Sequence, residues 1–360
     1  MAERLKDLFF TKESVNNMAD ALLKCYPQFD KNTFISSIFD EKFETLELKE
    51  KMRHTTECLY RTLPQEYIQA LDILKKAAPF IKGFEAMSLP DFVEMYGLND
   101  WNASLAALKH FTQYASSEFA IRPFLDQNPA KGMAFMKECA EDNHENVRRF
   151  ASEGCRPMLP WAMALPKFKK DPSLIFPVLE KLKDDESEFV RRSVANNLND
   201  ISKDHPDIAL DVCERWFGRS QNTDDIVKHA CRTLLKAGNK RALILFGFGD
   251  PDRIFVHNLK LSSNHPKIGD EIYFSFDLKV NEDKKSKVRL EYAIDYMKAG
   301  GKYSKKIFQI VEKEYTPGSY GFKRKLSLVD MTTRKHHPGE HHLRIHVNGE
   351  EKAKTFFLLK

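Results

Sequence analysis

The sequence has no hydrophobic run that approaches the ~20 residues needed to cross a membrane. Its N-terminus, MAERLKDLFF, also lacks the long apolar stretch of a secretory signal. Six cysteines are scattered without a CxxC pair, and the last 129 residues contain none. This spacing favours buried thiols over disulfides or a zinc site. We therefore expect a cytoplasmic protein with free thiols, and we also expect neither a metal nor an organic cofactor.

Signature motifs of several enzyme classes are also missing. The chain has no phosphate-binding glycine loop, no GxSxG and no HExxH. One cluster, comprising His336, His337, His341, His342 and His346, has the composition of a metal tract. It spans a turn and a predicted strand on which alternate residues face opposite ways, so we favour a loop with exposed histidines over a metal site.

Two segments of different periodicity follow one another along the 360 residues, of which 42% are hydrophobic. Helical periodicity predicts helices over residues 14–26, 31–39, 46–62, 67–80, 89–95, 102–119, 129–142, 145–154, 173–183, 188–202, 208–217, 223–237 and 239–246. After the GFGDP segment, alternation at period two predicts strands over residues 255–261, 271–280, 287–296, 305–314, 321–328, 341–347 and 354–359. The predicted fold is therefore multidomain. An all-α HEAT-like repeat solenoid occupies residues 1–250, and an all-β immunoglobulin-like sandwich occupies residues 251–360.

One pattern occurs twice near the middle of the helical part. ENVRRFASEGCRPMLP begins at Glu145 and EFVRRSVANNLNDISKDHP begins at Glu188, which places Val147 and Val190 at equivalent positions 43 residues apart. That separation is the period of a HEAT-type helical repeat. Each copy opens with a pair of arginines and then carries polar residues where a buried helix would carry apolar ones.

Each copy of the pattern has an apolar stripe and an opposite polar stripe. The apolar stripes comprise Val147, Ala151, Gly154 and Met158 in the first copy and Val190, Val194, Leu198 and Ile201 in the second. The polar stripes comprise Arg149 and Glu153 in the first copy and Arg192, Asn196 and Asp200 in the second. Because stacked repeats bury their apolar stripes against one another, we expect the polar stripes to form a continuous surface.

A single pair such as Arg149 and Glu153 would be read as solvated surface charge, but its recurrence on the next repeat favours a site. The equivalent stripe one repeat earlier runs along the predicted helix 102–119 to Glu118, near Pro123, which should end that helix. Glu118, Glu153 and Asp200 would then share one concave face and suit a cation. Four arginines beside them suit phosphates through bidentate contacts: Arg148, Arg149, Arg191 and Arg192.

Trp161 follows two prolines in RPMLPWAMAL, just beyond the first copy. One interpretation is a core tryptophan that packs between repeats. The other is an aromatic face that holds a cationic ring beside the carboxylates. The sequence leaves both open.

Positive charge is concentrated in the C-terminal part. Residues 251–360 contain 22 lysines and arginines against 14 aspartates and glutamates, whereas residues 1–250 contain 35 against 38. Such asymmetry indicates attraction to a polyanion. The run Lys323, Arg324 and Lys325 and the pair Arg334 and Lys335 flank a predicted loop, which makes this edge the candidate polyanion-facing one.

At these residues the sequence resembles the HEAT-like DNA alkylation repair glycosylases, the family of AlkC and AlkD. The resemblance spans most of residues 1–250 and is most specific at ENVRRFASEGCRPMLPW and RRSVANNLNDISKDHPD. The segment SEFAIRPF and the appended sandwich resemble the AlkC branch with an immunoglobulin-like domain. The resemblance implies a catalytic site of Glu118, Glu153, Trp161 and Asp200, with Arg149 on the DNA backbone. Asn196 joins the DNA-binding residues, but it stands where AlkD has tryptophan, so AlkD lesion contacts are not transferred to it.

The resemblance implies a monofunctional glycosylase that excises cationic N-alkylated bases, such as 3-methylcytosine and 1-methyladenine, from double-stranded DNA as a monomer. The residues agree with this chemistry, because a cationic base leaves without a general acid and carboxylates stabilise the sugar cation. No lysine nucleophile stands out in the stripe, which favours a hydrolase over a lyase. The alternative is a non-catalytic HEAT-repeat scaffold or a binder of unusual DNA structures. The three carboxylates distinguish the two, since a pure DNA binder has no use for acids that face phosphates.

Overall fold

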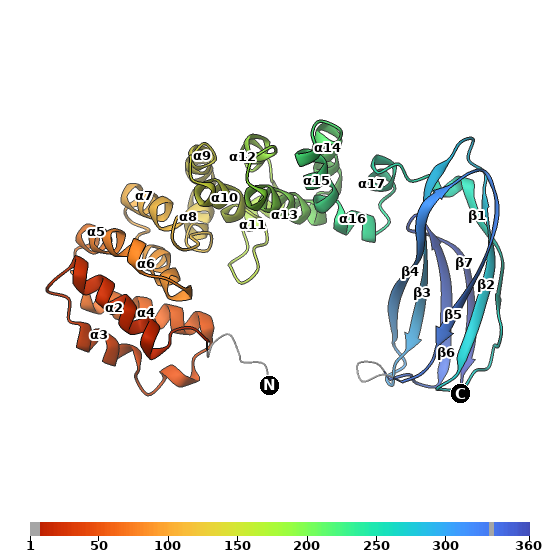
Figure 1. The fold of residues 1–360 in the computed structure, drawn as a ribbon, viewed down its shortest axis with the longest axis horizontal. Coiled ribbons are helices and arrows are strands. Elements are labelled where there is room, and N and C mark those ends of the chain that lie inside the picture. Colours follow the sequence, from red (N-terminus) through yellow and green to blue (C-terminus); the bar gives the residue numbers. More distant parts are fainter. Residues whose placement is uncertain (1–7, 331–334) are drawn as a thin grey trace. The chain divides into compact units, whose positions relative to one another are not determined.

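The computed structural model describes residues 8–330 and 335–360. The chain divides into two compact units, Met1–Ala230 and Cys231–Lys360 (Figure 1). The first unit is helical, and the second contains two short helices and all seven strands. The predicted order, a helical solenoid followed by a β-sandwich, is therefore confirmed.

Sixteen α-helices lie within the described residues. Those of the first unit are α2 (Lys12–Cys25), α3 (Lys31–Ile38), α4 (Leu48–Thr62), α5 (Tyr67–Ala77), α6 (Ser88–Tyr96), α7 (Trp101–Phe111), α8 (Arg122–Gln127), α9 (Pro129–Cys139), α10 (Glu145–Gly154), α11 (Pro166–Lys170), α12 (Phe176–Leu182), α13 (Glu188–Asp204), α14 (Pro206–Trp216) and α15 (Gln221–Ala230). The second unit begins with α16 (Arg232–Lys236) and α17 (Lys240–Leu245). Short 3₁₀ turns are η1 (Phe43–Thr45), η2 (Ala78–Phe80), η3 (Phe84–Met87) and η4 (Pro251–Arg253).

The helices of the first unit stack in pairs (Figure 1). Helix α9 packs on α10, α13 packs on α14, and α10, α13 and α15 follow one another in one row. The second apolar stripe, Val190, Val194, Leu198 and Ile201, is buried as predicted. In the first stripe Met158 is the exception. It lies beyond the end of α10 and is exposed, because the helix stops at Gly154.

The predicted helix over residues 102–119 is too long. Helix α7 ends at Phe111, and residues 112–121 form turns. Ser117 Oγ donates to the Leu108 carbonyl at 2.9 Å, which folds this segment back on α7. Pro123 does not end a helix but lies in the first turn of α8. Proline is tolerated there because the backbone N–H groups of a first turn have no partner within the helix. Glu118 therefore lies on a turn and not on a helix. Helices α8 and α11 were not predicted.

The seven predicted strands are all present. They are β1 (Ile254–Leu261), β2 (Glu271–Val280), β3 (Ser286–Met297), β4 (Tyr303–Tyr315), β5 (Gly318–Ser327), β6 (Gly339–Val347) and β7 (Glu350–Leu359). They form a three-stranded sheet in the order β1-β2-β5 and a four-stranded sheet in the order β4-β3-β6-β7, with antiparallel neighbours throughout. Alternate side chains of the two sheets, such as Phe274 and Phe276 against Leu343 and Phe357, form the core between them.

Helices α16 and α17 belong with the sandwich. The two units therefore divide between Ala230 and Cys231, and not at residue 250, where we predicted the boundary. Gly349, in the turn between β6 and β7, approaches Gly238 so closely that an added Cβ would lie 2.1 Å from the Gly238 Cα. Next to it, Asn348 Nδ2 donates to the Gly249 carbonyl at 2.7 Å. These backbone contacts join residues distant in sequence and leave no periodic signal.

Three of the five clustered histidines are buried and none is exposed, which corrects the predicted loop of exposed histidines. His336, His341 and His346 are buried. The His341 ring is stacked on Phe357 with centroids 5.2 Å apart, and burial lowers its pKa. His336 lies 3.2 Å from Asp330 Oδ1, so the buried histidines have different surroundings.

Candidate active site

Polar side chains join α10 to α13 where the two copies of the repeated pattern meet. Ser193 Oγ donates to Glu153 Oε2 at 2.7 Å, and Asn197 Nδ2 donates to the Ser152 carbonyl at 2.8 Å. Both side chains are buried. Buried polar groups need partners, and here each finds one on the neighbouring repeat. This explains the polar residues in the motif and fixes Glu153 relative to α13.

The three predicted carboxylates lie on neighbouring elements and are all buried. Glu118 lies in the turn before α8, Glu153 in the last turn of α10, and Asp200 in α13, with exposed fractions of 2%, 6% and 2%. Two arginines connect them, and Lys203 pairs with Asp200 at one end. We call the resulting row the charge ladder, and its members in order are Glu118, Arg149, Glu153, Arg156, Asp200 and Lys203.

Arginine side chains set the spacing of the charge ladder. Arg149 pairs with Glu118, and its Nη2 lies 3.8 Å from Glu153 Oε1. Arg156 donates from Nη1 to the same Glu153 oxygen at 2.5 Å and from Nε to Asp200 Oδ2 at 2.8 Å. Each carboxylate is compensated by a cation, because an unpaired buried charge would be strongly destabilising.

Burial controls the electrostatics of the site. It raises the pKa of Glu118 above the ordinary value for glutamate, and the Arg149 guanidinium opposes that shift. Glu118 Oε2 is buried and has no hydrogen-bond partner among the described residues. For Arg156, burial disfavours the charged form, but Glu153 and Asp200 outweigh it and raise the pKa. The site thus holds fixed charges and one acceptor oxygen to which no described residue donates.

Trp161 lies on the loop between α10 and α11, which projects from the helical unit (Figure 1). Its side chain is 59% exposed, so the core interpretation is wrong. Its φ of 67° is a left-handed conformation that is costly for a bulky residue. Lys49 Nζ donates to the Trp161 carbonyl at 2.7 Å, and Arg122 Nε donates to the Met163 carbonyl at 2.5 Å. These bonds hold the loop so that the indole is open to a ligand.

Sequence reasoning missed four cations that support the site: Lys49, Arg122, Arg156 and Lys203. Arg156 lies within the repeated motif, and its spacing of three residues from Glu153 is a signal that would have identified it. Arg122 lies in SEFAIRPF and is wholly buried, which lowers its pKa to about 10. It donates to the Gly154 carbonyl at 3.0 Å. No sequence signal connects Lys49 to Trp161, because 112 residues separate them.

The first arginine of each motif copy stabilises the repeat. Arg148 Nη1 donates to two carbonyls of the turn before α10, and Arg191 Nη1 donates to the two equivalent carbonyls before α13. Arg148 also pairs with Asp185 at 2.7 Å, and that bond raises its pKa. The guanidinium groups predicted to bind phosphates at these two positions therefore donate to protein oxygens.

The second arginine of each copy differs between the copies. Arg149 lies in the charge ladder with its side chain 22% exposed. Arg192 is 65% exposed and pairs at 2.6 Å with Glu188, an exposed residue. On the same helix, Asn196 Oδ1 lies 2.9 Å from His229 Nε2. Arg192 is thus the predicted phosphate contact of the helical unit that solvent reaches most readily.

The basic run of the second unit lies within β5. Lys323 lies over the Tyr273 ring at 5.0 Å, and Lys325 pairs with Glu271 at 2.8 Å. Arg324 is opposite the buried Phe274 in the strand register, so it follows the other face of the sheet. The run is therefore divided between two faces. Arg334, also predicted at this edge, lies outside the described residues.

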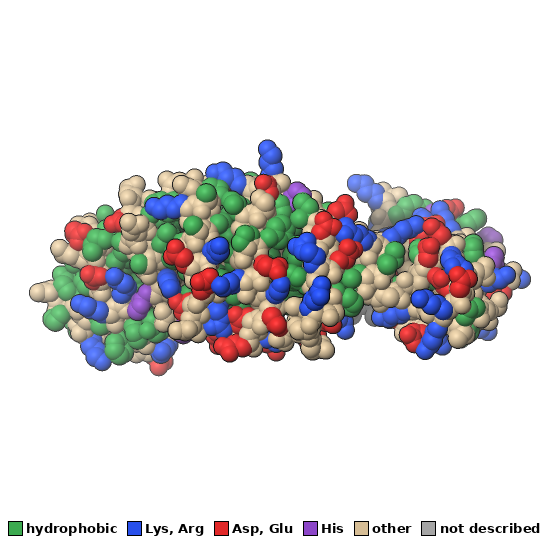
Figure 2. Space-filling view, turned by 90° about the horizontal axis from the view of Figure 1, so that it is seen from above, with side chains coloured by type: hydrophobic (Ala, Val, Ile, Leu, Met, Phe, Trp, Pro, Cys, Tyr) green, Lys and Arg blue, Asp and Glu red, His purple; other side chains and the backbone are tan. Residues whose placement is uncertain are grey.

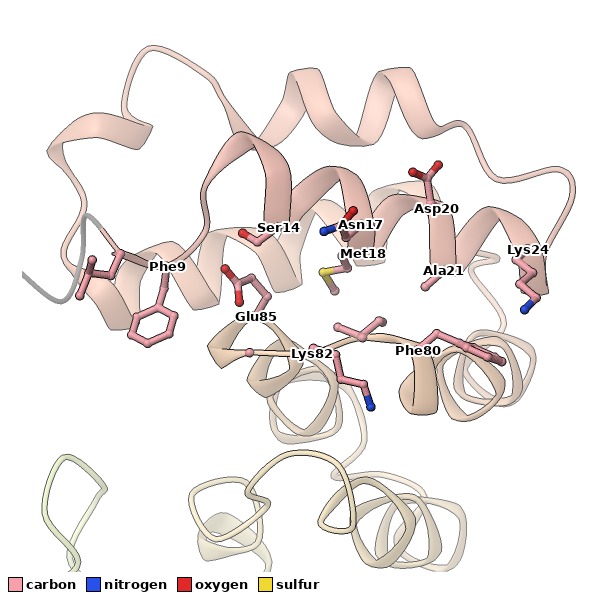
Figure 3. Close-up of a pocket in the computed structure, with 13 residues that line it drawn as sticks. Phe9, Ser14, Asn17, Met18, Asp20, Ala21, Lys24, Phe80, Lys82 and Glu85 are labelled. Atoms are coloured by element: carbon pink, nitrogen blue, oxygen red, sulfur yellow. The ribbon is translucent and has the colours of Figure 1, made fainter.

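Other features add no second candidate active site. On the face drawn in Figure 2, basic and acidic side chains are intermixed over the helical unit. A groove between α2 and η3 is bordered by Phe9, Met18 and Glu85 (Figure 3), and no predicted site residue among those described lines it. Within residues 8–330 and 335–360, no three His, Cys, Asp or Glu side chains are arranged to hold a metal ion. No described helix has both the length and the apolar character to cross a membrane.

Comparison with known proteins identifies the family of this chain. The family model described as DNA alkylation repair enzyme matches residues 35–234. The chain belongs to the DNA alkylation repair enzyme family. The matched region contains the charge ladder and Trp161. A second family model, described as the C-terminal Ig-like domain of the uncharacterised protein YhaZ, matches residues 255–360 and covers the sandwich of this DNA alkylation repair family member.

Two proteins are similar to this family member over nearly its whole length. A protein from Bacillus subtilis (strain 168), described as uncharacterized protein YhaZ, is 46% identical over 354 residues, which are 98% of each chain. A solved structure of Pseudomonas fluorescens alkylpurine DNA glycosylase AlkC, bound to DNA containing an abasic site analog, is 38% identical with a TM-score of 0.83. The match covers 99% of this chain and 100% of that chain, so the two share one fold.

Proposed function

We propose that this protein is a DNA glycosylase that hydrolyses the N-glycosidic bond of cationic N-alkylated bases, of the 3-methylcytosine and 1-methyladenine type, in double-stranded DNA. The observation that carries the proposal is the charge ladder, in which arginines hold three buried carboxylates of neighbouring elements in one row. Membership of the DNA alkylation repair enzyme family supports it, as does the similarity to a protein described as an alkylpurine DNA glycosylase.

The chemistry needs little beyond fixed negative charge and a water molecule. When the C1′–N bond breaks, its electron pair neutralises the cationic base, and positive charge develops on the sugar. Glu118, Glu153 and Asp200 supply preorganised charge that stabilises this cation. A water molecule then attacks C1′, and its proton passes to a carboxylate. Lys203 pairs with Asp200 at 2.8 Å, and a paired ammonium is not a nucleophile, which supports hydrolysis without a lyase step.

DNA binding is assigned to the arginines and to the basic second unit. Arg149 and Arg192 are proposed phosphate contacts, and Lys323 and Lys325 add positive charge on the outer face of β5. All members of the charge ladder come from one chain, which supports action as a monomer.

A single-turnover assay tests the proposal. The full chain is incubated with a duplex that contains one 3-methylcytosine or one 1-methyladenine, and alkali then cleaves the strand at abasic sites. The wild type should release the base, whereas Asp200→Asn and Glu118→Gln should be slower by roughly 100-fold, the effect of losing one electrostatic stabiliser. Glu188→Gln is the matched control, because this carboxylate lies on the same helix as Asp200 but is 73% exposed.

A non-catalytic binder of unusual DNA is the alternative. It is favoured by one observation, the pairing of all three carboxylates with cations, which a purely structural network would also show. Tight binding of the methylated duplex without release of either base would support this alternative and reject the glycosylase.

A further inference from the structure

The four-stranded sheet of the second unit, β4-β3-β6-β7, carries exposed apolar side chains on its outer face (Figure 1). They belong to the two edge strands of this sheet and comprise Tyr303, Ile307, Phe356 and Leu358. Single exposed apolar residues are common on protein surfaces. A group of them on one face of a sheet instead marks a binding surface.

Strand register places three rings of this face side by side. His342 in β6 is directly opposite Phe356 in β7, and the His342 and Tyr303 rings have centroids 5.3 Å apart. Because neighbouring strands lie roughly 5 Å apart, these three rings form a continuous row across the sheet. We call Tyr303, His342 and Phe356 the ring row. Phe357 points the other way into the core, so the exposed ring of Phe356 is not part of the core packing.

The carboxylates that border the ring row have partners within the sheet. Asp295 accepts a hydrogen bond from Arg344 Nε at 2.7 Å. Glu340 Oε1 lies 3.2 Å from His342 Nε2. Neither carboxylate is therefore available to neutralise a further cation at this face without losing a partner.

Lysines surround the ring row and are not neutralised. Two lie on the same face, opposite Asp295 and Arg344 in the strand register, and two lie in the turn between β3 and β4 beside Tyr303. They are Lys305, Lys354, Lys298 and Lys302, and all four are exposed. None of them forms an ion pair with a residue in the described part of the chain. The unpaired charge around the ring row is thus positive.

Rings bordered by unpaired cations suit a polymer that presents both aromatic faces and negative charges. Single-stranded DNA does so, because its bases are unpaired and every nucleotide carries a phosphate. In a duplex the bases stack on one another, which covers their faces. The lysines favour such a polyanion over a protein partner, for which the apolar side chains alone would suffice.

We propose that the ring row is a binding site for single-stranded DNA. Two or three bases stack on Tyr303, His342 and Phe356, and the four lysines contact the phosphates. Stacking of two or three bases on the aromatic side chains of a four-stranded sheet is an established mode of nucleic-acid recognition. The site goes beyond the proposed function, because stacking requires no damaged base. It also lies on the other sheet from Lys323 and Lys325.

Fluorescence anisotropy with the full chain tests the inference. The probe is a fluorescein-labelled oligothymidylate of about twelve nucleotides, within the range that single-strand sites occupy. Tyr303→Leu combined with Phe356→Leu removes two rings but keeps apolar side chains. Its affinity for oligothymidylate should fall roughly 100-fold, or about tenfold for each stacked base. Affinity for an undamaged duplex of the same length should be unchanged, and Phe356→Trp, which keeps a ring, should bind as the wild type does.

Two controls separate stacking from general effects. Phe255→Leu is the matched variant, because Phe255 is an exposed phenylalanine on β1 of the other sheet and its loss should change nothing. An oligomer of abasic nucleotides carries the phosphates without the bases. The wild type and the double ring variant should bind it equally.

Unchanged affinity of the double ring variant for oligothymidylate would overturn the inference and favour a protein partner for this face. An equal loss for oligothymidylate, duplex and abasic oligomer would also overturn it, because the effect would not depend on bases. If the double variant does not fold, Phe356→Leu alone should still show a loss of about tenfold. No measurement uses a damaged base, so this inference and the proposed function can fail independently.

Discussion

Arg156 Nε lies 2.8 Å from Asp200 Oδ2, a bond that joins the loop after α10 to α13 across 44 residues of sequence. The same guanidinium donates to Glu153 at 2.5 Å. One arginine therefore sets the separation of two carboxylates on neighbouring repeats. Its side chain is 10% exposed. In so buried a position the effective dielectric constant is low, so a fixed charge acts more strongly on a nearby cation than it would in water.

Arg156→Met should lower both stability and excision. Removing one partner from a buried ion pair typically costs about 3 kcal/mol, and here two carboxylates lose their partner. Thermal unfolding and single-turnover base release measure the two effects. Arg156→Lys should recover much of the stability but little of the rate, because lysine restores charge without the forked geometry. A folded Arg156→Met protein with the wild-type rate would show that the spacing of Glu153 and Asp200 does not matter for catalysis.

Arg192→Ala should change DNA binding, whereas Arg148→Ala should change stability. Arg192 is exposed, so its loss should weaken binding to damaged and undamaged duplex alike and reduce the salt dependence of affinity by about one counterion. Arg148 is bound to Asp185 and to the turn before α10, so its loss should lower the melting temperature and leave the salt dependence unchanged. Binding titrations at several salt concentrations and thermal unfolding separate the two. The assignments would be reversed if Arg148→Ala alone changed the salt dependence.

Asp91 should make the helical unit less stable as the pH rises. Burial raises the pKa of this carboxyl to about 6, an effect that Thr56 and Arg53 only partly oppose. Because the folded pKa exceeds the unfolded value, the stabilising contribution is complete below about pH 4 and is lost as the pH rises through about 6. When the pH rises from 4.5 to 8, the wild type should lose about 2 kcal/mol of unfolding free energy. The Asp91→Asn variant should not show this loss, because asparagine does not titrate.

Denaturant unfolding at the two pH values measures this change. Asp72→Asn is the control, because Asp72 is exposed and its hydrogen bond to Lys75 lowers the pKa, so no gain with rising pH is expected. An Asp91→Asn protein whose stability follows that of the wild type at both pH values would contradict the assignment.

Truncation after Ala230 should give a folded helical unit, whereas truncation after residue 250 should give a less soluble protein. The longer fragment keeps α16 and α17 but lacks Gly349 and Asn348, which contact this segment. Circular dichroism and gel filtration compare the fragments. The 1–230 fragment should also bind methylated duplex more weakly at ~150 mM salt, where charges are screened beyond about 8 Å. Affinity equal to that of the full chain would show that the basic unit does not hold DNA.

Local periodicity was enough to predict much of this protein. The 43-residue repeat, the seven strands and the buried stripe of α13 follow from spacings within short segments, because the helical and strand periods act over a few residues. The polar stripes, and then the resemblance to a family, directed attention to Glu118, Glu153 and Asp200, and the structure brings them into one ladder. Periodicity failed at Glu118, where the helical pattern was extended through a segment that turns instead.

Only the tertiary structure decided which groups are partners. The pairing of Arg156 with Asp200, the bond from Lys49 to Trp161 and the attachment of α17 to the sandwich join residues that are far apart in sequence. The free energy of such contacts depends on burial and on the distance between atoms, and neither has a period that a sequence displays. The sequence by itself therefore determined the elements and the residues that carry charge, whereas the packing of repeats determined which charges neutralise one another and which carboxylate oxygen has no partner in the described part of the chain.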